Sequence, residues 1–449
     1  MAPTRRRVLA LSSALAAGTL LSGCLSSSGS PASDGSENDP GTLTGTEKSN
    51  PVSTDETAIE TLARGNAEFG LTLLSSLAEE YPKENQFLSP LSASVVLAMT
   101  YAGARGETRD GMANALRFPY DGEPLHAAFG ETAERLETTA ERADTEEKQG
   151  TPFQLTTANA IWGQEDYPWR EDFLTTLRTY YDAGLHVCDF EGHADDATET
   201  INAWVADRTD GKISNLLPKT TLDARTRLVL TNAIYFRATW ASTFPEANTK
   251  RRPFTALDGT ESKVPMMAQS DSFPYAAVDG HRLIALPYVG DEVEMVVLLP
   301  REGTFEEFAA SLSADRLATL LGEMERTDGS ISLPKFSLES SLDLGATLSD
   351  LGMSRAFSPT ADFSGMADTE ETGENLSIDS VLQKCVIDVD ENGTEAAAAT
   401  AVEVGVTSAP MNPFEITVNR PFLFLIRHEP TDTVLFLGRV VDAAAGRSE

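Results

Sequence analysis

Apolar residues recur at helical spacing in the first half of the chain. A capping-box sequence, STDE, opens a predicted helix at residue 53, and Pro82 ends it. The apolar face of this helix consists of Ile59, Leu62, Phe69, Leu73 and Leu77. Periodicity and charge predict three further helices and one exposed helix or loop, in this order: 89–103, 108–116, 169–181 and 131–148.

Short apolar runs with β-branched or aromatic residues dominate the second half, where Pro300 and Pro334 end two of them. The runs expected as strands are 228–236, 294–299, 331–333, 422–426 and 434–437. The last two are apolar throughout and are joined by the turn-like sequence HEPTD, which predicts a hairpin buried on both faces. Helices followed by strands, without βαβ alternation or a repeat period, indicate one α+β domain over residues 54–442.

The chain of 449 residues is strongly acidic, with 69 Asp and Glu against 35 Lys and Arg and a formal net charge of −34. Nucleic acid and anionic membrane faces are therefore poor partners, since phosphate binding needs basic patches. Apolar residues make up 41% of the chain, which is enough for a substantial core. An acidic, hydrated surface is typical of proteins that stay soluble in high salt, so we expect a halophilic, haloarchaeal source.

The N-terminus carries the features of an export signal. Arginines at 5–7 precede a mostly apolar stretch over 8–21 that is too short for a permanent membrane span. The arginines resemble a twin-arginine export motif. The sequence LSGC resembles a lipobox, in which Cys24 is lipidated after cleavage. An incidental cysteine is the alternative for Cys24.

The residues behind this signal contain almost nothing to bury. Ser, Gly, Pro, Asp and Thr dominate 25–53, which predicts a flexible polar tether between the signal at 1–24 and the domain. Residues 443–449 are expected to form a short C-terminal tail. A lipid at Cys24 would place the protein outside the cell, anchored to the outer face of the cell membrane.

Signals of catalysis are weak. No G-x-S-x-G sequence occurs, and the S-x-x-K match at Ser332 contains Pro334 inside a strand-like run, where the required helical turn is unfavourable. The histidines are scattered without a recognisable acid or serine partner: His126, His186, His193, His281 and His428. A secreted hydrolase is therefore the weaker functional alternative.

Metal and disulfide chemistry are likewise disfavoured. His186, Cys188 and His193 are close in sequence, but a zinc site usually has a second closely spaced pair, so ordinary structural roles are favoured. With Cys24 in the signal, the remaining Cys188 and Cys385 imply no disulfide framework, and Cys385 is expected as a small buried residue. No cofactor is expected.

One segment near the C-terminus combines helix-forming and strand-forming signals. It begins at Glu391 and reads ENGTEAAAATAVEV, with four alanines before a valine-rich run. An exposed helix or a linker is the alternative for the alanines taken alone. Other sequence blocks accompany this segment: FLSPLS at 87–92, YAGARGET at 101–108, INAWV at 201–205, TDGKI at 209–213, LTNAIYF at 230–236, VPMM at 264–267, LPY at 286–288, LPKF at 333–336 and PFLF at 421–424.

Together these blocks closely resemble, in order, the serpin family of serine protease inhibitors from about residue 55 to 442. The resemblance implies three β-sheets, about nine helices and an exposed reactive loop near the C-terminus. It also implies that a protease cleaves the loop to the acyl-enzyme stage and is trapped when the loop inserts as a new central strand. We therefore expect a monomeric inhibitor of serine proteases, not an enzyme. A non-inhibitory serpin acting as a chaperone or binding module is the alternative.

The resemblance assigns the hinge of the loop to residues 391–402, with these named positions: Glu391, Gly393, Thr394, Ala396, Ala398 and Thr400. If Thr394 points into the core as part of a strand, the next three alternate positions point the same way, and all of them are small. Bulky or charged side chains there would obstruct a strand entering between two others. Gly393 is expected to supply the rotational freedom of the joint.

Family spacing places the scissile bond sixteen residues beyond Glu391, between Thr407 and Ser408. Val406 and Met411 are alternative positions, because the loop is longer than in typical members. The small apolar residues before this bond suit elastase-like or subtilisin-like proteases. They do not suit trypsin-like enzymes, which need Arg or Lys.

Ser92 and Asn232 match the family's polar cluster beneath the opening sheet, called the shutter, and Gln383 stands where histidine is usual. Glutamine both donates and accepts hydrogen bonds, so the cluster is expected to persist without the pH dependence of a titrating histidine. Helix capping is an equal alternative for the serines at 89–92. Asn392 begins a glycosylation sequon whose occupancy would hinder insertion, and we interpret this sequon as coincidental.

Overall fold

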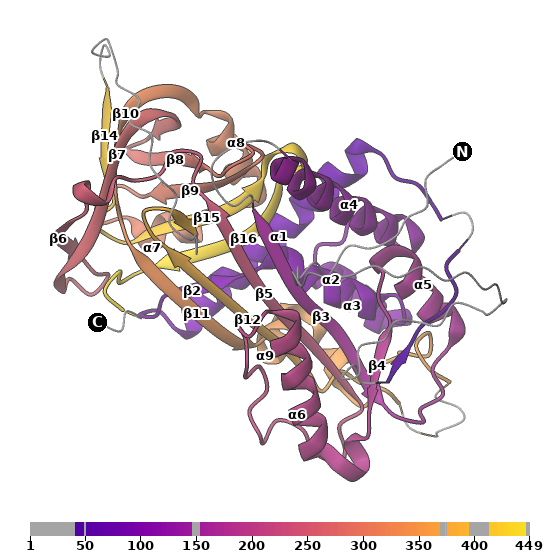
Figure 1. The fold of residues 1–449 in the computed structure, drawn as a ribbon. Helices are drawn as coiled ribbons and strands as arrows, with labels where there is room; N and C mark the ends of the chain where they lie inside the picture. The colour runs from indigo at the N-terminus through magenta and orange to yellow at the C-terminus, as the bar shows by residue number, and fades with distance from the viewer. Residues whose placement is uncertain are drawn as a thin grey trace, which may run out of the picture.

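The computed structural model describes residues 41–48, 51–145, 153–368, 373, 375–394 and 413–445. Several predicted features lie outside these residues: the export signal with Cys24, the hinge positions Ala396, Ala398 and Thr400, and the bond between Thr407 and Ser408. The described strands form two sheets, and helices surround them (Figure 1).

The first sheet has seven strands in the order β1-β4-β3-β5-β13-β12-β11. Their bounds are β1 (Thr42–Leu43), β3 (Gln154–Gln164), β4 (Leu185–Cys188), β5 (Leu228–Thr239), β11 (Phe336–Asp343), β12 (Ser380–Val389) and β13 (Gly393–Thr394). The strands β3 and β5 are antiparallel, whereas β5 and β12 are parallel. The long strands run diagonally across the molecule in Figure 1.

The second sheet follows the order β14-β10-β7-β8-β9-β15-β16-β2, and β6 pairs with β7. Its strands are β2 (Gln86–Leu88), β6 (Lys250–Thr255), β7 (Glu261–Val278), β8 (His281–Pro287), β9 (Val293–Leu299), β10 (Glu325–Pro334), β14 (Phe414–Thr417), β15 (Phe422–His428) and β16 (Thr433–Val440). The long strand β7 pairs successively with β6, β10 and β8. The seven-stranded sheet thus accounts for one of the three expected sheets. The other two appear as two parts of the second sheet, which share strand β7.

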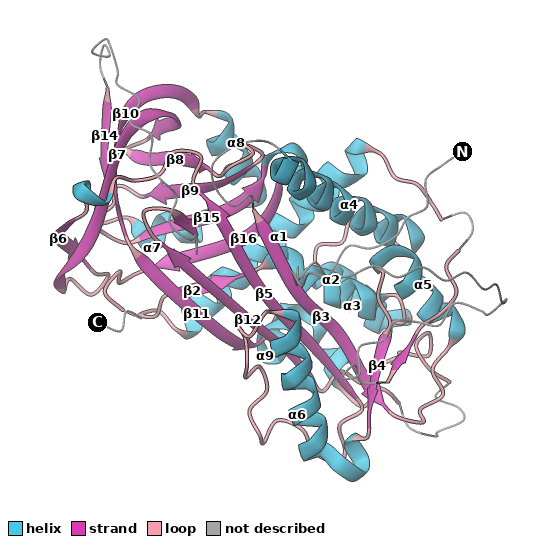
Figure 2. Cartoon of the chain, in the orientation of Figure 1, coloured by secondary structure: helices cyan, strands magenta, loops and turns pink. Residues whose placement is uncertain are grey.

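The α-helices of the described residues are α1 (Glu56–Glu80), α2 (Pro90–Tyr101), α3 (Gly106–Ala115), α4 (Glu123–Thr145), α5 (Glu171–Tyr181), α6 (Phe190–Arg208), α7 (Phe305–Ala310), α8 (Ala314–Gly322) and α9 (Gly345–Leu348). Helix α6 crosses the front of the first sheet, and α2 lies on its other face (Figure 2). Among these helices, none is long and apolar enough to cross a membrane. The predicted α+β class with about nine helices is confirmed.

Local sequence accounts for several elements. Ser89 caps α2 because its hydroxyl accepts a hydrogen bond from the backbone of Ser92, and Pro90 occupies the first helical position. The predicted apolar hairpin is formed by β15 and β16, which pair antiparallel and are buried except at Arg427. The predicted charged segment is helical from Glu131 to Thr145, as part of α4.

One helix boundary and one strand differ from the sequence predictions. Helix α1 is capped by Asp55, whose carboxylate accepts a hydrogen bond from Ala58 N at 3.0 Å, so the predicted cap at Ser53 is wrong by two residues. Strand β3 was not expected, because its polar residues interrupt the apolar pattern on which strand prediction relies.

The flexible tether predicted for 25–53 is wrong for its last part. Strand β1 pairs with β4, and Thr42 Oγ1 lies 2.9 Å from His186 Nδ1. Further along, Thr46 N donates to Glu171, and Lys48 N donates to Thr179 at 3.0 Å. The exposed edge of β4 offers backbone groups that β1 satisfies, so a polar segment becomes ordered without burying large side chains.

Candidate functional site

The two-residue strand β13 lies between β5 and β12 at one end of the first sheet. Gly393 pairs with Thr239 of β5, and Thr394 pairs with both Ala238 of β5 and Val389 of β12. Further along, β5 and β12 pair directly with each other. The first two residues of this segment therefore already occupy the place of an additional strand.

The side chain of Thr394 points into a closed polar site. Thr394 is 0% exposed, and its hydroxyl lies 2.8 Å from the hydroxyl of Tyr288. The Tyr288 ring stacks on Trp240, with 4.5 Å between the ring centroids. Burial raises the pKa of Tyr288 well above its ordinary value, so its phenol stays protonated and can donate a hydrogen bond.

Gly393 is required by the close approach of β13 to β5. A Cβ atom at this position would lie 2.0 Å from the carbonyl oxygen of Ala238 and 2.7 Å from the Cα of Thr239. Both are backbone atoms, so no side-chain rotation can relieve the overlap. Any larger residue would push β13 away from β5.

A turn leads from β12 into β13. The Asp390 carboxylate accepts hydrogen bonds from the backbone N of Asn392 at 2.8 Å and of Gly393 at 3.3 Å. Trp240 donates from its backbone N to Asn392 O and from its indole nitrogen to Asp390 O, both at 2.9 Å. Asn392, the sequon asparagine, is half-buried in this turn.

Glu391 fixes the turn to two residues that border strands: Lys335, between β10 and β11, and Thr249, just before β6. Its carboxylate accepts hydrogen bonds from Lys335 Nζ at 2.5 Å and from Thr249 Oγ1 at 2.7 Å. Burial alone would raise the pKa of Glu391, but the hydrogen bonds from Lys335 and Thr249 outweigh it and lower this pKa below its usual range. The start of the hinge is thus held by a charged contact that persists at neutral pH.

A chain of buried side-chain amides and hydroxyls lies further along the junction of β5 and β12. Asn232 Nδ2 donates to Ser92 Oγ at 2.5 Å and to Asn159 Oδ1 at 2.7 Å, and Ser92 Oγ donates to Asn159 Oδ1 at 2.9 Å. Gln383 Nε2 donates to Asn232 Oδ1 at 2.6 Å. The structure therefore brings together the three predicted shutter residues and adds Asn159 from β3.

Gln383 also connects β12 to the start of α2. Its Nε2 donates to Ser89 O at 3.0 Å, and its Oε1 accepts from Ser89 N at 3.2 Å. The Ser89 hydroxyl donates to Leu435 O at 2.7 Å while it caps α2. Capping and participation in the polar cluster are thus compatible roles for this serine. Separating β5 from β12 would break the bond between Gln383 and Asn232.

The residues considered for other chemistry do not form a site of their own among the described residues. No group of three or more His, Cys, Asp or Glu suited to a metal occurs in the described ranges. His186 stacks on Trp162 and His193 bonds to Asp189 at 2.7 Å, so the two histidines point to different partners. Cys188 and Cys385 are buried free thiols. Lys335 of the S-x-x-K match is ion-paired with the hinge.

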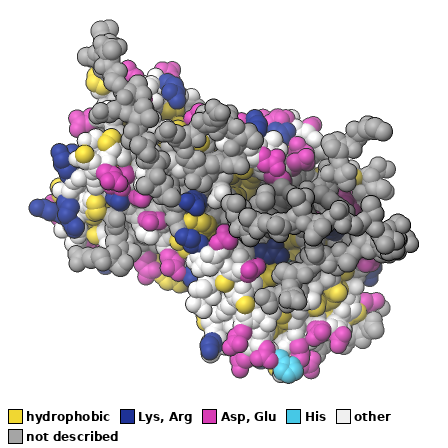
Figure 3. Space-filling model, in the orientation of Figure 1, with side chains coloured by type: hydrophobic (Ala, Val, Ile, Leu, Met, Phe, Trp, Pro, Cys, Tyr) yellow, Lys and Arg dark blue, Asp and Glu magenta, His cyan; other side chains and the backbone are white. Residues whose placement is uncertain are grey.

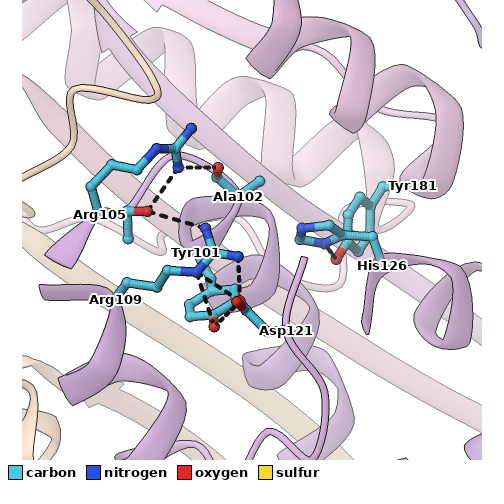
Figure 4. Close-up of polar contacts among 8 residues, drawn as sticks. Tyr101, Ala102, Arg105, Arg109, Asp121, His126 and Tyr181 are labelled. Atoms are coloured by element: carbon cyan, nitrogen blue, oxygen red, sulfur yellow. Dashed lines mark hydrogen bonds and ion pairs between the residues drawn. The ribbon is translucent and has the colours of Figure 1, made fainter. Parts of the chain in front are cut away.

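A second polar cluster joins the ends of α2, α3, α4 and α5 (Figure 4). Asp121 accepts hydrogen bonds from Tyr101 Oη and Arg109 Nε, both at 2.7 Å. His126 Nδ1 and Tyr181 Oη are also 2.7 Å apart. Burial, together with nearby cations, lowers the pKa of His126 to about 4. These polar groups are paired with one another, so we interpret the cluster as structural support.

Sequence reasoning missed several partners of the hinge and the shutter. Tyr288 and Lys335 lie inside the blocks LPY and LPKF, which resemble the family, but this resemblance did not indicate that the two residues contact the hinge. Asn159 is a single polar residue between two alanines, which is a usable sign of a buried hydrogen bond. Thr249 carries no sequence signal. The predicted reactive bond and the later hinge positions fall outside the described residues, so their roles stay predictions.

Comparisons with known proteins agree on one family. The family model for Serpin (serine protease inhibitor) matches residues 64–443. An uncharacterised serpin-like protein of Thermococcus kodakarensis is 39% identical over 365 residues, covering 81% of this chain and 82% of the relative. The leukocyte elastase inhibitor of Bos taurus is 37% identical, covering 85% and 99%. The crystal structure of tengpin, a thermophilic serpin in its native state, superposes with a TM-score of 0.77 at 31% identity, covering 90% and 100%.

Proposed function

The chain belongs to the serpin family, and we propose that it inhibits a serine protease as a suicide substrate. In this reaction the protease serine attacks the carbonyl of Thr407, the bond to Ser408 breaks, and an ester joins inhibitor to protease. The cleaved loop then inserts between β5 and β12. Insertion drags the protease along the sheet and distorts its active site before water can hydrolyse the ester.

The observation that carries this proposal is the position of β13. Thr394 pairs with Val389 of β12 and with Ala238 of β5. Gln383 lies six residues before Val389, and Asn232 lies six residues before Ala238. These two residues pair with each other. A strand continuing from Thr394 in the same register would bring residue 400 between Gln383 and Asn232. Its alternate residues from 394 to 400 would face the shutter, and the sequence supplies only Ala and Thr at these four positions.

Insertion along this register is energetically favourable. A strand placed between two others pairs on both edges, and a dozen new hydrogen bonds at about 0.5–1.5 kcal/mol each contribute on the order of 10 kcal/mol. The uninserted form would then persist because of a kinetic barrier. The bonds within the shutter, which must break when β5 and β12 separate, are a physical source of such a barrier. An inserted segment from Thr394 to Thr407 would extend over roughly 45 Å.

The target is proposed to be elastase-like or subtilisin-like. The small apolar side chains before Thr407 fit a shallow hydrophobic pocket, whereas a trypsin-like pocket would need Arg or Lys. Similarity to the bovine leukocyte elastase inhibitor supports this class of target.

We also propose an extracellular location. The support is the basic and apolar N-terminus followed by LSGC, which predicts export and a lipid at Cys24. The protein would be a monomer on the outer face of the membrane of a halophilic cell. The test compares wild type with Cys24→Ser in fractionated cells. The wild type should sediment with membranes and the variant should not, and equal partition of both would contradict the anchor.

One experiment tests the inhibitory function directly. The protein is incubated with subtilisin or elastase, and products are separated in SDS and identified by mass. A covalent complex whose ester lies within residues 404–411 supports the proposal. Loop cleavage without a complex would indicate a substrate-like, non-inhibitory serpin, and turnover of an ester substrate would indicate a hydrolase. Thermal unfolding of the cleaved protein should occur at a much higher temperature than that of the intact protein.

A further inference from the structure

A second contact between β5 and β12 lies at the end of these strands that is farthest from β13. Asp379, the residue before β12, donates from its backbone N to Leu228 O at 2.9 Å. Its carboxylate oxygen Oδ2 accepts from the backbone N of Leu228 at 3.0 Å and of Arg227 at 2.7 Å. One residue thus binds three backbone groups at the start of β5, and we call this contact the base clasp.

The bonds of Asp379 cross from one strand to another. Acidic side chains are common on the surface, for example over the lower end of α6 in Figure 3. Several aspartates, such as Asp55, Asp258 and Asp390, bind backbone N–H groups within three residues of themselves. Asp379 instead joins the start of β12 to the start of β5. Its side chain is exposed, so the clasp can open without leaving a charge buried.

The base clasp lies in the path of the proposed insertion. The register that would bring residue 400 to the shutter would bring residue 404 between Leu228 and Asp379, because each of these lies ten residues before the partner of Thr394 on its strand. A strand entering from β13 would therefore pass the shutter first and reach the clasp last.

The clasp occupies the backbone groups that residue 404 would need. The N–H and the C=O of Leu228 are both bonded to Asp379, so both face β12. An inserted antiparallel strand pairs with β5 through the N–H and C=O groups on this edge. Residue 404 and Asp379 would therefore compete for the same two groups of Leu228.

Partial insertion does not require the clasp to open. Next to β13, β5 and β12 pair again within three residues of the partners of Thr394, at Tyr235 and Val386. By the same spacing, insertion as far as residue 401 would leave the clasp intact. Complete insertion would break it.

We propose that Asp379 is a positioning residue that makes the last stretch of insertion a step of its own. The proposal rests on the proposed inhibitory function and deepens it. In the uncleaved protein the clasp holds β5 and β12 together at their base, through bonds that the carboxylate charge strengthens. It therefore stops a loop that has entered only partway. After cleavage, residue 404 reaches Leu228, and the bonds of the new strand replace those of the clasp.

The test measures how fast the full-length, uncleaved protein converts to a heat-resistant monomer. Samples are held a few degrees below the unfolding midpoint, and the fraction that stays folded on later heating above this midpoint is followed over time. Asp379→Ala removes the two carboxylate bonds, whereas Asp379→Asn keeps an oxygen that can accept both. Asp379→Ser takes the place of the alanine variant if that variant does not fold.

Asp258→Ala is the matched control. Asp258 is also exposed and its carboxylate also accepts a backbone hydrogen bond, from Thr260 N at 2.9 Å, but this bond lies within the turn between β6 and β7. The control thus removes an aspartate of the same kind without touching the junction of β5 and β12.

Asp379→Ala should convert roughly tenfold faster than the wild type, because the closed form loses two hydrogen bonds that opening must otherwise break. Asp379→Asn and Asp258→Ala should convert at the wild-type rate. Wild type and Asp379→Ala, once cleaved in the loop with subtilisin, should unfold at the same temperature, because the inserted strand has replaced the clasp. A purely structural role would instead lower the unfolding temperature of the cleaved and uncleaved forms alike.

Equal conversion rates for Asp379→Ala and Asp258→Ala would overturn the proposal, and so would an equal loss of thermal stability in the cleaved and uncleaved forms of Asp379→Ala. If loop cleavage makes the wild type heat-resistant while these rates are equal, only the role of the clasp is refuted. If the cleaved wild type does not become heat-resistant, the loop does not insert and the inhibitory function itself fails.

Discussion

The hydroxyl groups of Thr394 and Tyr288 lie 2.8 Å apart in a closed site between β5, β12 and the second sheet. This bond joins Thr394 of β13 to the block LPY, which is far away in the sequence. It holds Thr394 in its place between β5 and β12. The start of the predicted hinge is thus already part of the sheet.

Replacing Tyr288 with Phe should weaken this attachment. The Thr394 hydroxyl would be left buried without its partner, at a cost of about 1–3 kcal/mol to the free energy of unfolding. Urea unfolding of the intact protein measures the change. Tyr275→Phe is the control, since no hydrogen bond of the Tyr275 hydroxyl is found among the described residues. A loss of stability no larger than in this control would show that the bond contributes nothing.

Thr394→Arg should abolish the SDS-stable protease complex while loop cleavage continues. The 0% exposed site next to Tyr288 cannot take a long cation, and burying an unpaired charge is strongly unfavourable. Thr394→Ser keeps the hydroxyl and should retain the complex. Gel analysis after incubation with protease gives both readouts. If Thr394→Arg still traps protease, insertion from this hinge is not the mechanism.

Gln383→His should introduce a pH dependence into shutter opening. Glutamine does not titrate, whereas a buried histidine among the amides of Asn232 and Asn159 would be neutral in the closed cluster. Acid would protonate it and favour separation of β5 and β12. The unfolding rate of the variant, divided by that of the wild type, should rise between pH 7.5 and 5.5. A constant ratio would exclude this cluster as the gate.

Two histidines that were expected to have ordinary roles are buried and should make stability pH-dependent. Burial lowers the pKa of His126 and of His428 to about 4. The pKa of each histidine in the unfolded chain is about 6.5, so between pH 4 and pH 6.5 the unfolded chain binds more protons than the folded protein. The stabilisation is complete above pH 6.5 and is lost as the pH falls toward 4, by up to about 3 kcal/mol for each group. His428→Gln should flatten the curve of unfolding midpoint against pH. An unaltered slope would contradict the assignment.

Removing the docked N-terminal segment should destabilise the domain. A protein that begins at residue 54 lacks β1 and its pairing with β4, and it also loses the bond between Thr42 and His186. Compared with a protein that begins at residue 41, its thermal midpoint should be lower by about 2 °C or more. Thr42→Val in the longer protein removes only the side-chain bond and should have a smaller effect. Identical midpoints for the two lengths would mean that the segment contributes nothing to stability.

Local sequence carried much of the fold and the composition of the hinge. The helix after Ser89 and the apolar hairpin of β15 and β16 follow from capping and from uninterrupted apolar runs, which act over a few residues. The hinge was predicted because its alternate positions carry the small side chains that a strand entering between two others would require. Ordered motif blocks then indicated the family, and the comparisons confirm it.

Only the tertiary structure showed which side chains bond to the start of the hinge and to the shutter. The bonds from Tyr288 to Thr394, from Lys335 to Glu391 and from Asn159 to the shutter join segments far apart in the chain, so no periodicity encodes them. The same holds for β1, a polar segment whose order depends on a free strand edge and not on its own apolar residues. Sequence by itself determined that Thr394 and the alternate positions after it, up to residue 400, carry small side chains. Long-range packing decided that Gly393 and Thr394 already lie between β5 and β12.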